Sequence, residues 1–475
     1  MISLQDYLAM DASAMAEGIR TAQFTPRELL DCAIEQAQKL NPRLNAINTP
    51  CFEQASAILD ALPVDTAMGG LPFLIKDLSD LKDIPTHKGC ALFADFVPNQ
   101  SAAIVERFLQ AGMIPIGKSN TPELGLTITT EPVATGITRN PWNLHHSTGG
   151  SSGGAAAAVA AGIVPVAHAT DGGGSIRIPA SCCGLVGLKP SRGLTLIEPG
   201  LAESWSGMSV GHVLSRSVRD CAKFLELISL DKPLLYPMPT APRDFTAQLG
   251  AGPGPLQIAV QTWHPFGEAI DQECIDAVNT AARLCESLGH SVTELDTKPD
   301  YRAAAKAMNS LIALHSFQAV NARVKELQLS LDTAPMETST RQMAQYGASL
   351  GIDDYTQAIE TLHRVGREMD GLHERYDAVL SPVLAKTPAT LGWLDMNSEK
   401  ATTYINRYKS YGGFTALHNG TGQPALSVPM SSTADSLPIG VMFSAAWGGD
   451  LTLLQLAAQI ESARPWPLLA PLAIA

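Results

Sequence analysis

The 475-residue sequence predicts an α/β fold in a single domain over residues 1–475. Short apolar runs of strand length alternate with longer amphipathic segments along the chain, and glycine-rich loops stand where the two kinds of segment join. The composition is that of a folded protein, because 45% of the residues are hydrophobic and only 17% are charged, so a large core can be buried. Length alone favours two or three domains, but large α/β enzymes often exceed that expectation.

The first segment is predicted to be helical. Apolar residues recur at helical spacing over residues 13–40. Thr25 and Pro26 interrupt them, and a second helix is expected to begin there, with a threonine cap and a proline at its first position. Asn41 and Pro42 are expected to end that helix. A short strand over residues 44–48 and a helix over residues 51–62 follow.

Lys76 stands at the end of the next predicted strand, which covers residues 69–77. Lysines at strand ends usually lie in solvent, but the apolar run before this one can bury it. A buried lysine loses proton affinity and can then serve as a general base. The chain continues with an amphipathic helix over residues 101–111 and a strand over residues 113–118.

Residues 112–119 fit the nucleotide-binding pattern GxxxxGK[ST], but their context does not. A phosphate-binding loop follows a strand and stays flexible between its two glycines. Here a predicted helix precedes Gly112, and a proline-containing strand joins the glycines. The sequence therefore does not predict nucleotide binding.

Residues 147–193 are the stretch around which the rest of the chain is organised. A glycine- and serine-rich loop leads into a helix over residues 155–161, a buried strand over residues 163–169 and a second glycine-rich loop. In that second loop Ser175 follows three glycines, whose N–H groups face no side-chain obstruction. A nucleophilic hydroxyl beside free amides is the arrangement that an oxyanion hole requires.

The second half of the chain continues the alternation. We expect an amphipathic helix over residues 215–230, a proline- and glycine-rich connector over residues 231–255 and a long helical tract over residues 301–376. The remaining predicted elements are strands over residues 256–261, 291–295, 376–382, 424–429 and 438–445, and helices over residues 271–288 and 451–460.

These motifs resemble those of the amidase-signature family of hydrolases. The family's nucleophile matches Ser175 in GGGSIRIPA, its cis-serine matches Ser151, 24 residues earlier, and its lysine matches Lys76, 75 residues earlier still. The likeness extends through GKSNTPELG, TRNPWN and GLKPSRG to the C-terminal NGTGQPALSVP, and covers almost the whole chain. TTEPVATGITRNPWN and IPASCCGLVGLKPSRG are similar to the bacterial branch of 6-aminohexanoate-cyclic-dimer hydrolases.

The resemblance implies a large mixed β-sheet core covered by helices on both faces. It implies a signature core over about residues 65–215 and a variable, substrate-shaping helical region over about residues 300–375. The implied activity is hydrolysis of small neutral carboxamides (aryl, aliphatic or cyclic) through an acyl-enzyme, without metal or cofactor. The implied site residues are the catalytic Lys76, Ser151 and Ser175, the oxyanion-hole glycines Gly172, Gly173 and Gly174, the substrate-binding Gly125, Thr127 and Ser151, and the supporting Asp171, Arg177 and Ser152.

Two other serine patterns and three histidines are not assigned to catalysis. Residues 149–153 fit the GxSxG nucleophile elbow, but the residues before them do not indicate a strand, and residues 79–82 fit SxxK without its partner motifs. His145, His146 and His168 are interpreted as surface or core-polar side chains, because the resembling family transfers protons without histidine.

Composition limits the partners. The net charge of −13 argues against binding to nucleic acid or to an anionic membrane surface. The eight cysteines show no CxxC or Cys/His spacing and are expected to be reduced thiols. The first residues lack the basic and apolar regions of an export signal, so a cytoplasmic location is expected. A small amide is the expected partner, and a homodimer is the assembly that we consider.

Three other functions stay open. One is that of the glutamine-hydrolysing component of a tRNA-dependent amidotransferase, which typically has glutamine where Ile178 stands. The second is an esterase, because the same groups can cleave esters. The third is a non-catalytic binding protein on the same fold, against which the intact set of three catalytic positions argues.

Overall fold

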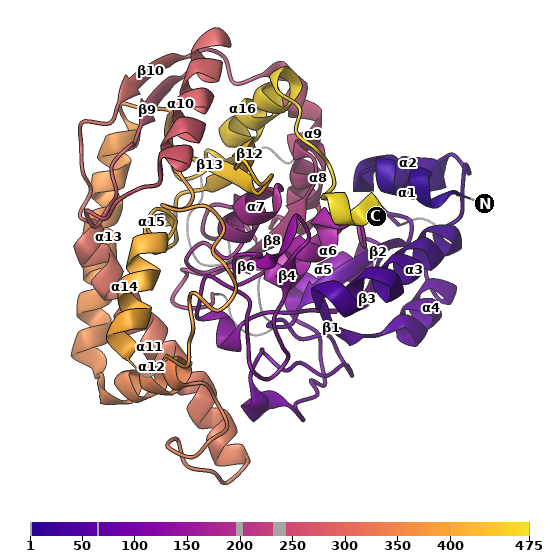
Figure 1. The fold of residues 1–475 in the computed structure, drawn as a ribbon, viewed down its shortest axis with the longest axis horizontal. Coiled ribbons are helices and arrows are strands. Elements are labelled where there is room, and N and C mark those ends of the chain that lie inside the picture. Colours follow the sequence, from indigo (N-terminus) through magenta and orange to yellow (C-terminus); the bar gives the residue numbers. More distant parts are fainter. Residues whose placement is uncertain (1, 64–65, 196–202, 231–243, 399, 475) are drawn as a thin grey trace.

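A mixed sheet of eight strands is the largest element of the computed structural model, which describes residues 2–63, 66–195, 203–230, 244–398 and 400–474 (Figure 1). In spatial order its strands are β10 (Ser291–Glu294), β9 (Gln257–Val260), β11 (Ala378–Pro382), β13 (Pro438–Ala445), β12 (Ala425–Ser432), β7 (Val186–Lys189), β8 (Val210–Ser215) and β6 (Val166–Asp171). β10, β9 and β11 are parallel to one another, and the pairings from β11 to β6 are antiparallel.

A smaller sheet contains the strand that ends at Lys76. Within the described ranges it has three strands, in the order β1 (Ile47–Pro50), β3 (Met113–Ser119) and β2 (Leu71–Lys76). β2 runs parallel to β3, and all of its residues are buried. β2 also packs against β6 of the larger sheet. The edge strands of the two sheets therefore face each other in the interior.

The alanine-rich helix α6 (Gly153–Ala160) lies where the two sheets meet, and it is buried along its whole length. It contacts β6 of the larger sheet and β2 and β3 of the smaller one. Because its side chains are small, strands can approach it closely from both sides. The glycine-serine loop that precedes α6 is thereby held at the junction of the sheets.

Helices cover both faces of the eight-stranded sheet. On β12, Leu426 and Val428 pack in one apolar cluster with residues of α8, α10 and α16, whereas Ala425 packs in another with residues of α7. These helices are α7 (Arg177–Cys183), α8 (Val218–Ile228), α10 (Gln272–Ser287) and α16 (Asp450–Ala463). Successive apolar side chains of β12 point to opposite faces of the sheet, so helices are needed on both faces to bury them.

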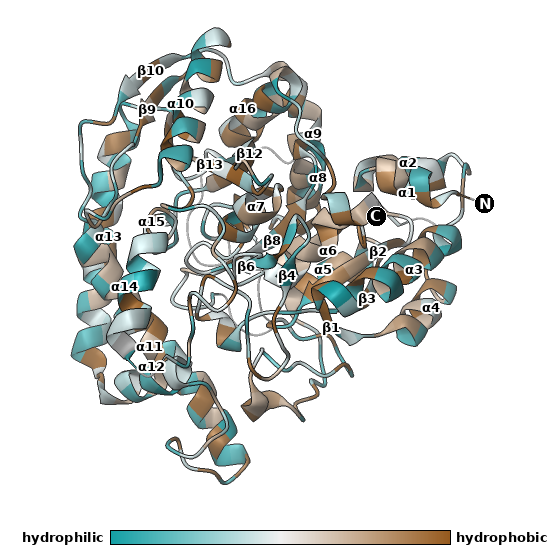
Figure 2. Ribbon diagram, in the orientation of Figure 1, coloured by the Kyte–Doolittle hydropathy of each residue, from teal (hydrophilic) through white to brown (hydrophobic). Residues whose placement is uncertain are grey.

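The other helices surround this core. Figure 2 shows hydrophilic segments on peripheral helices such as α13, while α6 near the centre is more hydrophobic. No described helix is long and apolar enough to cross a bilayer. The helices are α1 (Leu4–Ala9), α2 (Ala12–Arg20), α3 (Pro26–Leu44), α4 (Phe52–Asp60), α5 (Ala103–Gln110), α9 (Phe245–Gln248), α11 (Tyr301–Glu326), α12 (Thr338–Ser349), α13 (Ile352–His373), α14 (Ala401–Tyr411) and α15 (Leu417–Thr421).

Three predicted boundaries were wrong. α3 continues through Pro42 to Leu44, and its C-cap residue Asn45 adopts a left-handed conformation (φ 51°) and donates its N–H to the carbonyl of Asn41. The following strand β1 is accordingly displaced by about three residues. β6 also begins later than predicted, after Pro165, because a proline cannot donate to the sheet ladder.

Strands were also missed: β7 and β8 of the large sheet, and two strands before the first glycine-serine loop. Residues there form the hairpin of β4 (Arg139–Asn140) and β5 (Asn143–Ser147). The Asn140 amide stabilises it by donating to the carbonyls of Ser147 and Cys182. Because a polar side chain holds the hairpin together, apolar alternation did not reveal it. The hairpin is separate from both sheets, so it does not supply the strand of a nucleophile elbow.

The helical tract predicted over residues 301–376 consists of α11, α12 and α13. α1, α7, α14 and α15 were not predicted. Of the predicted connector over residues 231–255, residues 231–243 lie outside the described residues, and α9 lies in the remainder.

Candidate active site

Lys76 ends β2 inside the protein, and its side chain is fully buried. Its Nζ donates to Ser151 Oγ at 2.7 Å and to Thr170 Oγ1 at 3.0 Å. Burial lowers the pKa of Lys76 to about 7, an effect that the Asp171 carboxylate partly opposes. The amine can therefore exist in its neutral, proton-accepting form near neutral pH.

Ser151 lies in the first glycine-serine loop, and the Gly150–Ser151 peptide bond is cis. The next residue, Ser152, connects this loop to the second one. Its amide donates to the carbonyl of Ser175 at 3.3 Å, and its Oγ donates to the carbonyl of Thr170 at 3.2 Å. The structure thus brings together Lys76, Ser151 and the backbone of Ser175.

The second loop presents Ser175 immediately before α7, and Ser175 is 8% exposed. Within the described residues, the amides of Gly172, Gly173 and Ser175 donate no hydrogen bond. They are therefore free to face a ligand oxygen. Gly174 differs from the prediction, because its amide donates to Asp171 Oδ1 at 2.7 Å and so is not a free oxyanion donor.

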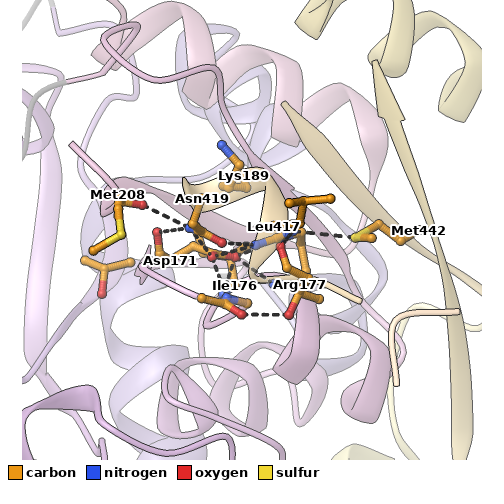
Figure 3. A network of polar contacts seen from close by, with 12 residues as sticks. Asp171, Ile176, Arg177, Lys189, Met208, Leu417, Asn419 and Met442 are labelled. Atoms are coloured by element: carbon orange, nitrogen blue, oxygen red, sulfur yellow. Dashed lines mark hydrogen bonds and ion pairs between the residues drawn. The ribbon is translucent and has the colours of Figure 1, made fainter. Parts of the chain in front are cut away.

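Asp171 fixes this loop through a buried ion pair with Arg177 (Figure 3). Arg177 binds both carboxylate oxygens, with Nε donating to Oδ2 at 3.0 Å and Nη2 donating to Oδ1 at 2.9 Å. Burial raises the pKa of the carboxyl, but Arg177 and the side-chain amide of Asn419 together hold it well below its usual range. Asp171 therefore stays ionised, and the bidentate pair gives the loop a defined shape.

Thr415 and Asn419 reach the same loop from a distant part of the chain. Thr415 Oγ1 donates to the carbonyl of Gly173 at 2.6 Å. Asn419 donates to the carbonyl of Asp171 at 2.8 Å and accepts from Arg177 at 2.6 Å. Residue-by-residue reasoning missed both, as it missed Thr170. A signal for Asn419 existed, because the family-like stretch NGTGQPALSVP begins there.

Uncharged groups flank the two loops. An ideal Cβ built on Gly125 would lie 3.2 Å from Ser151 Oγ, and one on Gly172 would lie 2.9 Å from the Trp205 ring. One built on Gly173 would meet no described atom within 4 Å. Thr127, the other predicted substrate-binding residue, is buried. A side chain at Gly173 would therefore meet open space, whereas one at the neighbouring Gly172 would meet the indole of Trp205.

Known proteins resemble this chain over nearly its whole length. The amidase family profile matches residues 28–454. The chain is 34% identical to 6-aminohexanoate-cyclic-dimer hydrolase of Paenarthrobacter ureafaciens, over 97% of this chain and 96% of that protein. A solved structure of 6-aminohexanoate cyclic dimer hydrolase covers 100% of both chains, with a TM-score of 0.92 and 31% identity. A solved bacterial aryl acylamidase of the amidase-signature family covers 96% of each chain, with a TM-score of 0.84 and 27% identity.

These findings confirm the resemblance and the mixed α/β fold predicted from the sequence. The family match covers most of the chain, including both glycine-serine loops and Lys76. The chain belongs to the amidase-signature family, and it is a hydrolase that acts on the carbon–nitrogen bonds of amides.

Proposed function

We propose that this enzyme hydrolyses small neutral carboxamides through Lys76, Ser151 and Ser175. One observation carries the proposal: a fully buried lysine, with its pKa lowered to about 7, donates a 2.7 Å hydrogen bond to a serine whose loop adjoins the backbone of a second serine, Ser175. A lysine in that state is a suitable general base for activating a serine nucleophile.

The chemical steps follow from this arrangement. Ser175 Oγ attacks the amide carbonyl carbon, and its proton passes through Ser151 to Lys76. The amides of Gly172, Gly173 and Ser175 donate to the developing oxyanion; losing one such donor typically costs about 3 kcal/mol of transition-state stabilisation. As the carbon–nitrogen bond breaks, the proton returns through Ser151 to the leaving amine.

The acyl-enzyme is then released by the reverse route. Water attacks the Ser175 ester while Lys76 accepts its proton through Ser151. The tetrahedral intermediate collapses to the carboxylic acid, and Ser175 regains its proton. Every proton taken up in one half-reaction is returned in the same half-reaction, so these residues need no further acid or base.

A neutral substrate fits the groups around the loops. Trp205, Thr415 and Ile178 lie against the glycines and are uncharged, and the Asp171–Arg177 pair neutralises itself. The names of the relatives add cyclic and aryl amides to the substrates worth testing. Glutamine is a weaker candidate, because its ammonium and carboxylate would need charged partners, and the buried Ile178 offers none.

The test is a release assay with purified protein on a p-nitroanilide, short aliphatic amides, a cyclic diamide, a p-nitrophenyl ester and glutamine. We expect turnover of neutral amides by the wild type and none by Ser175→Ala. Ser79→Ala is the matched control, because Ser79 is also a buried serine and belongs to the SxxK pattern that we do not assign to catalysis. Full activity in Ser175→Ala would refute the mechanism, and turnover of glutamine or the ester alone would refute the substrate class.

A further inference from the structure

β2 of the smaller sheet faces β6 of the larger sheet, and we call the junction of these two strands the sheet seam. The edge of β2 at this seam has no strand partner in the described part of the chain. On its other edge β2 pairs with β3, and the amide of Asp77, the next residue, donates to the carbonyl of Ser119. Successive amides along an extended chain point in opposite directions, so the amide of Lys76 points away from β3, toward β6. β2 and β6 share no strand ladder in the described part of the chain. A buried amide in this position needs an acceptor from a side chain.

His168 on β6 supplies that acceptor. Its Nδ1 accepts from the Lys76 amide at 3.3 Å, and its ring is fully buried. The ring packs against Phe108 of α5, with 5.7 Å between the ring centroids. Two residues further along β6, Thr170 accepts from Lys76 Nζ. Because residues i and i+2 lie on one face of a strand, a single face of β6 holds both the backbone and the amine of Lys76.

The hydrogen bond fixes the form of the imidazole. Nδ1 accepts from an amide, so the neutral ring carries its proton on Nε2, which has no partner among the described residues. Burial and the nearby Lys76, Lys118 and His212 lower the pKa of His168 to about 3. His168 is therefore a neutral acceptor near neutral pH, and the proposed mechanism assigns it no proton transfer.

We propose that His168 is a positioning residue: by accepting from the Lys76 amide across the sheet seam, it holds the Lys76 backbone where Nζ reaches Ser151 Oγ. This inference rests on the proposed function of Lys76 and deepens it. It assigns a role to a histidine that the sequence analysis interpreted only as a surface or core-polar side chain. β2 and β6 meet at Lys76, and the hydrogen bond to His168 joins the two strands there.

The test compares three variants at this position. His168→Leu fills the space without an acceptor, His168→Asn places an amide oxygen near the Nδ1 position, and His168→Gln places it further out. The readout is the rate at which a fluorophosphonate labels Ser175, followed by intact mass from pH 6 to 9, with Ser175→Ala as the unlabelled reference. This probe reports the reactivity of Ser175 without requiring the natural substrate.

We expect His168→Leu to label at least tenfold more slowly, with a displaced pH midpoint, and His168→Asn to recover most of the rate. If His168→Leu does not fold, the contrast between Asn and Gln decides, and equal rates in those two variants would refute the inference. Wild-type rates and pH midpoint in His168→Leu would also refute it. Absence of labelling at Ser175 in the wild type would instead overturn the proposed function itself, so the two failures are distinguishable.

Discussion

Lys76 lies in an environment that acts on its proton in two opposing ways. Complete burial disfavours the ammonium form, whereas the Asp171 carboxylate favours it, and the balance lowers the pKa to about 7. In this buried environment Nζ donates a hydrogen bond to Ser151 Oγ. Proton acceptance in the proposed mechanism requires the neutral amine, so the fraction of competent enzyme depends on pH in the physiological range.

We therefore expect kcat/KM to rise with pH, by about tenfold per unit below about pH 7, and to level off above it. The sign follows because deprotonation of Lys76 creates the active form. A pH profile of the hydrolysis of a neutral p-nitroanilide between pH 5 and 9 measures this, with enzyme returned to pH 8 after each exposure to exclude inactivation. A flat profile would contradict the assignment, and so would a tenfold rise per unit that continues to pH 9, as the ordinary lysine pKa of about 10.4 would give.

Gly172 shows how a single absent side chain shapes the site. An ideal Cβ there would lie 2.9 Å from the Trp205 ring, closer than real contacts allow. We expect Gly172→Ala to lower kcat by about 10²-fold, because the loop must shift and its amide leaves the position that stabilises the oxyanion. Adding Trp205→Ala removes the clash and should restore part of kcat relative to Gly172→Ala. Equal kcat in the single and double variants would show that the indole is not the obstruction.

At the scale of elements, patterns that are local in sequence predicted structure well. The start of α3 was predicted from Thr25 and Pro26 and is confirmed, with Thr25 and Glu28 forming a capping box. β2 and β3 were predicted from their apolar runs and are confirmed within two residues. The hairpin of β4 and β5 was missed, because a side-chain amide and not apolar alternation stabilises it. Local secondary-structure propensity does not predict such a contact.

The loop before α7 depends on an ion pair that is entirely removed from water. Arg177 is the countercharge of Asp171, and the carboxylate also accepts from the amides of Gly174 and Ile176. We expect Arg177→Met to lower the free energy of unfolding by about 3–5 kcal/mol, because it leaves a buried carboxylate without its partner. Urea unfolding at pH 8 measures the loss.

The double variant Asp171→Asn with Arg177→Met is the control for that experiment. It removes both charges, so it should recover part of the stability lost in Arg177→Met alone. Asp171→Asn alone is measured as well. If the double variant is less stable than Arg177→Met by the whole amount that Asp171→Asn alone costs, the two residues act independently. The buried pair would then not be what holds the loop.

At the scale of the whole molecule, the candidate site is assembled from distant segments. The spacing of Lys76, Ser151 and Ser175, together with the family resemblance, predicted the positions that the fold brings together. Thr415 and Asn419 lie some 240 residues beyond the loop that they hold. The seam between β2 and β6 has no sequence pattern, because it depends on how two sheets meet. Tertiary contacts of this kind were not predictable from periodicity or motif spacing.

The junction of the N-terminal helices with α8 and α16 concentrates buried carboxylates. Asp220 accepts from the amides of Ala12 and Ser13, and Glu461 accepts from the amide of Val218 at the start of α8. Burial raises the pKa of Asp220 to about 6 and that of Glu461 to about 7, and the neighbouring Asp11 carboxylate adds to both. The folded protein therefore retains protons here that the unfolded chain releases at lower pH.

This proton retention makes stability fall as pH rises between about 4.5, the ordinary glutamate value, and about 7, because the folded state binds more protons than the unfolded state in that window. Glu461→Gln cannot ionise and keeps an oxygen that accepts from Val218. We expect it to match the wild type near pH 4.5 and to exceed it by on the order of 2 kcal/mol at pH 8. Urea midpoints at both pH values measure the difference, with the exposed Glu286→Gln as control. A stability difference that is the same at both pH values would show that the pKa of Glu461 is the same in the folded and unfolded states, and that proton retention at this residue does not contribute to stability.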